Sequence, residues 1–190
     1  DLSVQMEMRF KEKSPRMVAP DQLNGDLQFL DYAFSLLQLI DTTQLKPVQK
    51  EIWEKQQLAI ASKQVELKVY RKHPEFYDMG PWLASLLDVT NDLNYKLLKI
   101  RETLDSAGQY FEYAQRNVDY FPEDRTLKAI EKQRSFVNFI GTALQDSLDN
   151  SSLTEAQKKM VTEKMEKGIM AASDYAAYCR SKLYEKEQLQ

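Results

Sequence analysis

The 190-residue sequence has few of the side chains that bind metals or act as nucleophiles: it contains one histidine, His73, and one cysteine, Cys179. A catalytic zinc site usually takes about three protein ligands, drawn largely from His and Cys, and no H-E-x-x-H motif occurs here. A di-iron bundle would need a pair of Glu-x-x-His motifs, but Tyr70 stands three residues before His73. The sequence therefore predicts no catalytic residue, no metal ligand and no cofactor site in this chain.

Other absences exclude further classes of protein. The five glycines are scattered, so no glycine-rich phosphate loop can form. The formal charge of −3 comes without a basic block, which argues against nucleic-acid binding. No apolar run approaches the roughly 18–20 residues of a membrane span, and a single cysteine leaves the redox compartment open. Both an exported and a cytoplasmic location are compatible with these observations.

What the chain does have is helix-forming composition. Leu, Gln, Glu, Lys and Ala are plentiful, and these side chains lose little freedom in a helix. The connections between the periodic segments are short, which favours antiparallel neighbours. The sequence therefore predicts an all-α fold: an irregular antiparallel bundle of about five to seven helices, several of them long.

Apolar periodicity and breakers predict where the helices lie. The expected ranges are 24–41, 47–72, 81–89, 93–118 with a bend near Gly108, 127–148, and a last helix that opens with the capping box Thr154-Glu-Ala-Gln157. The first helix carries two adjacent apolar stripes, so we expect it to be central and buried on more than half of its circumference. One stripe contains Leu23, Leu27, Leu30, Phe34 and Leu37; the other contains Phe29, Ala33, Leu36 and Ile40.

The later helices carry apolar stripes of their own. Arg134 interrupts the stripe of residues 127–148, so we expect a snorkelling stem or a buried ion pair there. On the last helix, small residues in the middle of the apolar face predict a close approach by a neighbouring backbone. We expect residues 1–22, in which Met6, Met8 and Phe10 alternate with charged residues, to form an N-terminal arm, and residues 23–187 to form a single bundle domain.

The segment from His73 to Trp82 is the most irregular and aromatic part of the sequence. Its aromatic side chains could line a groove, or they could plug the gap between two helix ends, which is the commoner role at such corners. His73 could bind a ligand, although capping the C-terminus of the preceding helix is the favoured interpretation. The candidate groove-lining residues are Tyr70, His73, Tyr77 and Trp82.

Two other candidates have simpler explanations. Cys179 lies on an apolar face beside Ala176 and Leu183, where a thiol usually serves as a small hydrophobe. Paired carboxylates for acid–base chemistry remain conceivable because Asp and Glu are common, but solvated helix faces explain them better.

An ordered series of short motifs runs from Val69 to Leu144. The series is Tyr70-Arg-Lys-His-Pro-Glu-Phe-Tyr77, Arg101-Glu-Thr-Leu104, Tyr113-Ala-Gln-Arg-Asn117, Pro122, Leu127-Lys-Ala-Ile130 and Phe136-Val-Asn-Phe139. It resembles the N-terminal helical half of the bacterial domain-of-unknown-function family 885, whose pattern has a Pro-x-x-Tyr and an Ala-Arg-x-Asn-Leu-like segment. Pro74, Tyr77, Ala114, Arg116 and Asn117 occupy those positions, and residues 26–45 resemble the preceding helix more loosely. Members tend to have a proline where this chain has Ser106-Ala-Gly108.

The resemblance implies a part in a larger protein. Full-length members of the family are similar to zinc metallopeptidases of the gluzincin type, with an H-E-x-x-P-G-H helix in the C-terminal half. Nothing in this chain matches that helix, so the resemblance transfers no catalytic or metal residue, and zinc would be expected only with a downstream catalytic half. The partners it implies are that missing half or a peptide substrate.

Three functional hypotheses follow. The leading one is a non-catalytic helical domain that forms one wall of the substrate cleft in a peptidase-like protein, either an excised piece or a natural short relative. The alternative is an interaction module that binds a partner helix or forms a homodimer. A stand-alone hydrolase that uses carboxylates is the weakest of the three.

Overall fold

A computed structural model describes residues 18–88 and 92–188 of the chain. These residues are largely helical and include no strand, which confirms the all-α prediction. Helix α2 (Pro20–Gln38) begins inside the predicted arm, because Pro20 stands in its first turn, where a missing N–H costs nothing. The arm predicted for residues 1–22 therefore ends too late, and its residues 1–17 lie outside the described part of the chain.

Contacts divide the chain into two compact units, Asp1–Arg71 and Lys72–Gln190. The boundary falls at the end of helix α3 (Pro47–Lys72), whose predicted range is confirmed. The helix end predicted at residue 72 lies next to this boundary, but a helix end alone does not predict a division into two units. A single domain over residues 23–187 stays a prediction.

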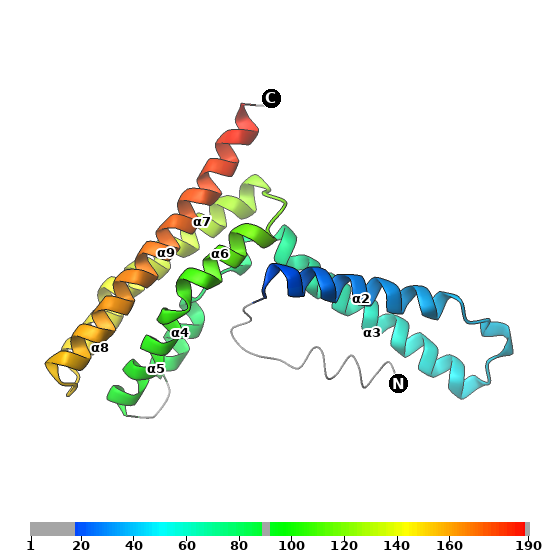
Figure 1. Ribbon diagram of the computed structural model, residues 1–190, viewed down its shortest axis with the longest axis horizontal. Coiled ribbons are helices and arrows are strands. Elements are labelled where there is room, and N and C mark those ends of the chain that lie inside the picture. The colour runs from blue at the N-terminus through cyan, green and yellow to red at the C-terminus, as the bar shows by residue number, and fades with distance from the viewer. Residues whose placement is uncertain (1–17, 89–91, 189–190) are drawn as a thin grey trace. The chain divides into compact units, whose positions relative to one another are not determined.

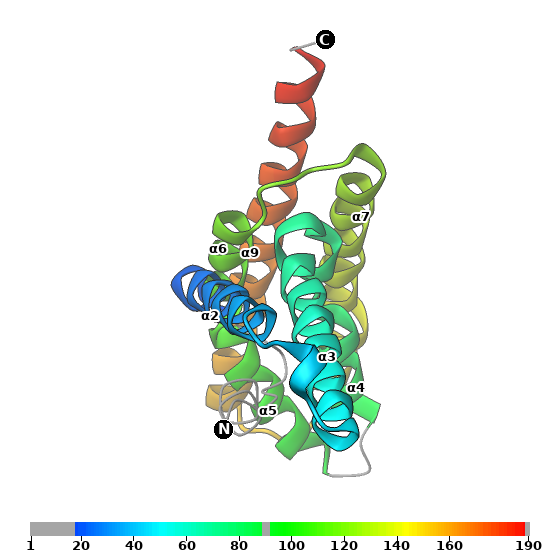
Figure 2. The ribbon, with the colours of Figure 1, turned by 90° about the vertical axis from the view of Figure 1, so that its right-hand side faces the viewer.

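The first unit contains a helical hairpin. Helices α2 and α3 run side by side in opposite directions and are joined through the short 3-10 helix η1 (Thr42–Gln44) (Figures 1 and 2). In the connecting loop, Oδ1 of Asp41 accepts a hydrogen bond of 3.0 Å from the amide of Thr43. The core of the hairpin consists of Val18, Leu23, Leu27, Leu30, Ala33, Leu37, Ile60 and Leu67.

The two apolar stripes of α2 have different surroundings. The first is largely buried, as predicted, whereas Leu36 and Ile40 of the second are 44% and 41% exposed. Ala33 of the second stripe is 1% exposed and Phe29 packs against the hairpin core, so this stripe is covered as far as Ala33. The expected burial on more than half of the circumference is therefore wrong at the loop end of α2, where Leu36 and Ile40 are exposed. The central position of α2 stays a prediction.

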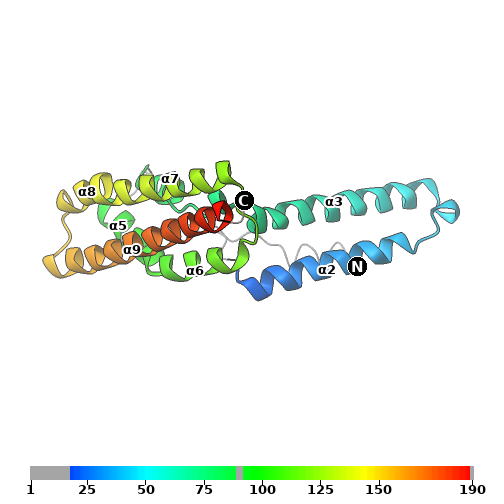
Figure 3. The ribbon, with the colours of Figure 1, turned by 90° about the horizontal axis from the view of Figure 1, so that it is seen from above.

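The second unit is a bundle built around the last helix. Its elements are η2 (Pro74–Phe76), α4 (Gly80–Asp88), α5 (Leu93–Asp105), α6 (Ala107–Asn117), α7 (Glu123–Phe139), a π-helical segment (Ile140–Leu144), α8 (Gln145–Asp149) and α9 (Glu155–Glu187). Helix α9 contacts α5, α6 and α7, and it lies between α6 and α7 (Figure 3). No helix in the described part of the chain is both long and apolar enough to cross a membrane.

The bend predicted near Gly108 lies two residues earlier. Helix α5 ends at Asp105 and α6 begins at Ala107, with Ser106 between them. The Ser106 hydroxyl donates to the Thr103 carbonyl oxygen at 2.8 Å, and the Ser106 amide donates to the same oxygen at 3.0 Å. These two hydrogen bonds tighten the last turn of α5 and separate α5 from α6.

The stripe predicted for residues 127–148 is partly wrong. Leu127 is 52% exposed and Arg134 is also exposed, whereas Gln133 and Phe136 are buried. The physical reason is the π-helical segment Ile140–Leu144, which adds a residue to one turn and shifts the inner face on one side of it relative to the other. Arg134 therefore needs neither a snorkelling stem nor a buried ion pair.

Helix α9 begins with the predicted capping box. The Thr154 amide donates to Oε1 of Gln157 at 3.0 Å, and the Gln157 amide donates to Oγ1 of Thr154 at 3.3 Å. The sequence predicts that a neighbouring backbone approaches the small residues on the inner face of α9. At Gly168, the atom that approaches most closely belongs to a side chain instead. A Cβ added to Gly168 would lie 2.8 Å from Cδ2 of Leu104.

Candidate functional site

The irregular segment after α3 is a turn held by side chains from two helices. The Tyr175 hydroxyl donates to the Pro74 carbonyl oxygen at 3.0 Å, and Gln133 Nε2 donates to the Tyr77 carbonyl oxygen at 2.7 Å. Lys132 Nζ donates to the carbonyl oxygen of Glu75 at 2.9 Å. Three carbonyl groups between residues 74 and 77 are thus bound by α7 and α9, which fixes the path of a segment that has little regular structure.

A charged cluster lies on the same turn. Glu75 is buried, and its Oε1 lies 3.3 Å from Nη1 of Arg125 and 3.3 Å from Nδ1 of His73. Nη1 of Arg125 also lies 2.8 Å from Nε2 of His73. A guanidinium has only donors, so the ring nitrogen that it binds must offer a lone pair. The same guanidinium nitrogen also contacts Nδ1 of His73, so both ring nitrogens lie against Arg125.

A second ion pair continues this cluster toward α4. Lys132 Nζ lies 3.5 Å from Oδ2 of Asp78, and Oδ1 of Asp78 accepts a 2.9 Å hydrogen bond from the amide of Gly80. The carboxylate therefore faces the first turn of α4, where a negative charge is favourable. This network orients the turn and leaves His73 engaged on both ring nitrogens, so it is better suited to holding structure than to moving protons.

The predicted groove residues have different surroundings. Tyr77 is 1% exposed and packs in the core against Tyr110 and Tyr175, with ring centroids 5.7 and 6.2 Å away, so it cannot line an open groove. Tyr70 packs against the core of the hairpin, and Trp82 is half-buried on α4. For Tyr70, His73 and Trp82 the groove-lining role stays a prediction. Aromatic content located the corner but did not reveal which rings face inward.

Sequence reasoning missed the residues that hold the turn. Gln133, Lys132 and Arg125 are polar residues on a helix, a pattern that predicts a solvated face and not a partner in the turn. The inner position of Gln133 on α7 follows only when the π-helical segment is taken into account. For Tyr175 the sequence does contain a signal, because it is a large aromatic residue among the small residues of α9.

Cys179 is buried beside Tyr175. Burial raises the pKa of its thiol to about 12, so the reactive thiolate is scarce at neutral pH. Burial also raises the pKa of the Tyr175 hydroxyl. The prediction that Cys179 serves as a small hydrophobe is confirmed.

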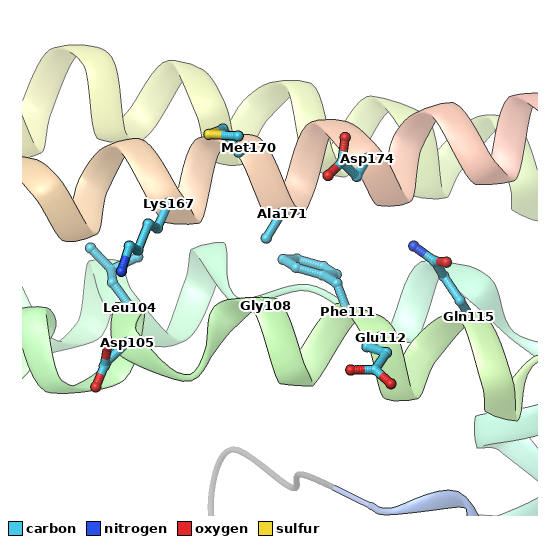
Figure 4. A pocket seen from close by; sticks show the side chains of 10 residues that line it. All are labelled: Leu104, Asp105, Gly108, Phe111, Glu112, Gln115, Lys167, Met170, Ala171 and Asp174. Atoms are coloured by element: carbon cyan, nitrogen blue, oxygen red, sulfur yellow. The ribbon is translucent and has the colours of Figure 1, made fainter.

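A cavity of about 410 Å³ lies between α9 and the α5–α6 pair (Figure 4). Phe111 and Ala171 face each other across it, and Lys167 reaches into it from α9. Three carboxylates, those of Asp105, Glu112 and Asp174, are among the lining residues.

These carboxylates do not form a catalytic pair. The side chains of Glu112 and Asp174 point away from each other, to opposite sides of the cavity (Figure 4). Asp105 is bound by the Lys164 ammonium, and this hydrogen bond together with the lysine charge lowers the pKa of its carboxyl. Acid–base catalysis by paired carboxylates therefore has no support at this cavity.

Within residues 18–88 and 92–188, no group of three or more His, Cys, Asp and Glu side chains is arranged to hold a metal ion. The carboxylates of the turn are instead paired with cations, Glu75 with Arg125 and Asp78 with Lys132. The described part of the chain thus offers structural polar networks and open cavities.

Comparison with known proteins adds a likeness in fold. No family model matches the chain, and no curated protein matches its sequence. A solved structure from Shewanella oneidensis, of a protein of unknown function described as a lipoprotein, is similar to it with a TM-score of 0.67 at 13% sequence identity. The match covers 91% of this chain and 32% of the neighbour, so the chain spans about a third of the neighbour's length.

Proposed function

We propose that this chain is a non-catalytic helical domain that forms one wall of the substrate cleft in a larger, zinc-metallopeptidase-like protein. The observation that carries the proposal is the extent of the structural likeness: nearly all of this chain is similar to about a third of a longer one. The ordered motifs from Tyr70 to Phe139 support the same placement, because they resemble the N-terminal helical half of such proteins. An exported location is part of the proposal, since the neighbour is described as a lipoprotein.

The polar network of the turn is consistent with a supporting role. It fixes the backbone between His73 and Gly80 through Arg125, Lys132 and Gln133 on α7 and Tyr175 on α9. A rigid wall of this kind positions a substrate or a neighbouring domain without taking part in the chemistry. In the proposed protein, the downstream half would hold the zinc, which would supply Lewis-acid chemistry for peptide hydrolysis.

Zinc content and peptide hydrolysis test the proposal on the purified 190-residue chain. We expect no stoichiometric zinc by elemental analysis after dialysis, and no hydrolysis of a mixed peptide library. Tightly held zinc together with chelator-sensitive hydrolysis would show that the chain carries a complete active site and would overturn the proposal.

One observation favours a second candidate function, self-association through the hairpin. Five apolar side chains near the loop between α2 and α3 are exposed: Leu36 at 44%, Leu39 at 82%, Ile40 at 41%, Val48 at 68% and Ile52 at 52%. Val48 and Ile52 are spaced by one turn of α3, so they form a short ridge, and Leu36 and Ile40 lie at and just beyond the end of α2. A cluster of this kind usually marks an interaction surface.

The charges of the two helices indicate a second copy of the chain as the occupant. Helix α2 has three aspartates and no basic residue, whereas α3 has six basic side chains against three glutamates, a formal +3. Two hairpins that pack with α2 beside the partner's α3 place opposite charges next to each other, and the four helices then form a bundle. The opposite arrangement, α2 against α2, brings like charges together.

Sedimentation velocity over a concentration series tests this second candidate. We expect the wild-type chain to dimerise as concentration rises, and Leu36→Glu and Ile52→Glu to remain monomeric because each buries a charge at the contact. The matched control is Leu58→Glu, which changes an exposed apolar residue of α3 outside the cluster. A wild-type chain that stays monomeric, or a control that disrupts the dimer equally, would contradict the candidate.

A further inference from the structure

A second cavity, of about 420 Å³, lies between α7 and α9. Its polar lining consists of Gln133, Arg134, Asn138, Ser173 and Arg180, and its apolar lining of Val137 and Ala176. None of these residues is acidic. The cavity therefore differs in charge from the one in Figure 4, which carries three carboxylates.

The two arginines that line this cavity are not engaged elsewhere. Within the described residues, neither Arg134 nor Arg180 makes an ion pair or a hydrogen bond through its side chain. Other cations of the same bundle are paired: Arg125 with Glu75, Lys132 with Asp78 and Lys164 with Asp105. Two guanidinium groups at one carboxylate-free cavity attract an anion, and their planar forks match the geometry of a carboxylate.

Gln133 lines the same cavity and carries a buried acceptor. Its side chain is 1% exposed, and Nε2 is used in the hydrogen bond to the Tyr77 carbonyl oxygen. Its Oε1 has no hydrogen-bond partner. A buried amide oxygen without a donor costs free energy, so a ligand that brings an N–H to it gains an interaction that water at the surface does not offer.

We infer that the cavity between α7 and α9 binds the C-terminal residue of a peptide, with Arg134 and Arg180 on the carboxylate and Gln133 Oε1 accepting the adjacent peptide N–H. The carboxylate and this N–H lie on the same residue of such a ligand, which matches a site that offers cationic donors and a neutral acceptor. Asn138 and Ser173 supply further polar contacts at the wall. The volume falls in the range of about 300–1,000 Å³ that is usual for small-ligand sites.

The inference does not depend on the proposed function. It requires that a carboxylate be recognised, and it requires no zinc and no downstream half. The site would serve equally well to hold the end of a peptide substrate or the end of a partner chain.

Isothermal titration calorimetry with the full chain tests the inference, with N-acetyl-alanyl-alanine as the probe. We expect saturable binding of the free acid and no binding of the same dipeptide as its C-terminal amide. Acetate and inorganic phosphate are the other arms, and we expect both to bind more weakly because neither brings an N–H to Gln133. Equal binding of acid and amide, or of acid and acetate or phosphate, would overturn the assignment.

Matched arginine variants locate the site. Arg134→Gln and Arg180→Gln should each weaken binding of the free acid roughly tenfold or more, as expected for loss of a charge-assisted hydrogen bond. Arg116→Gln is the control, because Arg116 is an exposed arginine on α6, next to Glu112. All three replacements are at exposed positions, so thermal unfolding should be unchanged. Binding that survives both test variants would overturn the inference, as would equal weakening in the control.

Discussion

The hydroxyl of Tyr175 donates a hydrogen bond of 3.0 Å to the carbonyl oxygen of Pro74, a residue 101 positions earlier in the chain, and both residues are buried. This bond joins the middle of α9 to the turn that follows α3. Removing the hydroxyl with Tyr175→Phe keeps the ring contacts and leaves the carbonyl with one partner fewer. We expect the free energy of unfolding to fall by about 1 kcal/mol, as measured by urea denaturation.

Tyr178→Phe is the control for that change. The Tyr178 hydroxyl also donates to a backbone carbonyl, that of Gln115 at 3.1 Å, but the residue is only half-buried. Water replaces the lost partner there, so we expect little change in stability. A control that destabilises as much as Tyr175→Phe would show that burial does not decide the strength of these bonds.

The carboxylate of Glu75 depends on the guanidinium of Arg125. Arg125→Met removes the cation, so the buried carboxylate of Glu75 loses its ion pair with the guanidinium. We therefore expect the free energy of unfolding to fall by roughly 1–3 kcal/mol. Adding Glu75→Gln should recover part of this loss, because a neutral amide needs no counter-charge. Additive effects of the two changes in a double-mutant cycle would mean that the residues are not coupled.

Gly168 provides room for the side chain of Leu104. Gly168→Ala would bring a Cβ to 2.8 Å from Cδ2 of Leu104, a fully buried residue that cannot move freely, and overpacking of this kind costs about 1–3 kcal/mol. Gly141→Ala is the matched change, since nothing lies within 4 Å of a Cβ added there, and we expect it to stabilise by about 0.5–1 kcal/mol. Thermal unfolding of both variants measures the contrast, and a Gly168→Ala variant as stable as wild type would refute it.

Cys179 links stability to alkaline pH. Its pKa is raised from an ordinary 9.0 to about 12 by burial, so the folded state favours the neutral thiol. The resulting stabilisation is fully present below pH 9 and is lost as pH rises through about 12. Between these values the wild-type chain should lose stability more steeply than Cys179→Ala, as followed by denaturation at a series of pH values. Parallel curves for the two proteins would rule out this linkage.

Much of the fold could be predicted from the sequence because breakers and caps act locally. Pro47 and the His73–Pro74 pair bound α3, and the Thr154–Gln157 capping box opens α9 where expected. The all-α class follows from composition and periodicity alone. These features depend on residues within a few positions of one another.

The errors arise where distant packing decides. The π-helical segment at Ile140–Leu144 changes which residues of the α7–α8 run face inward, and an apolar stripe drawn through it placed Leu127 and Arg134 on the wrong face. The stripe containing Leu36 and Ile40 predicts burial, but both side chains are exposed. Burial requires a neighbouring helix, and the pattern within one helix does not show whether such a neighbour is present. The inward position of Tyr77 and the role of Gln133 are likewise set by residues more than 30 positions away.

The reading frame that continues past the codon for Gln190 in the natural gene tests the central proposal most directly. If the chain is the helical wall of a larger zinc-peptidase-like protein, sequencing should show the frame continuing into an H-E-x-x-P-G-H helix. A stop codon immediately after Gln190 would contradict this account and favour the self-associating hairpin.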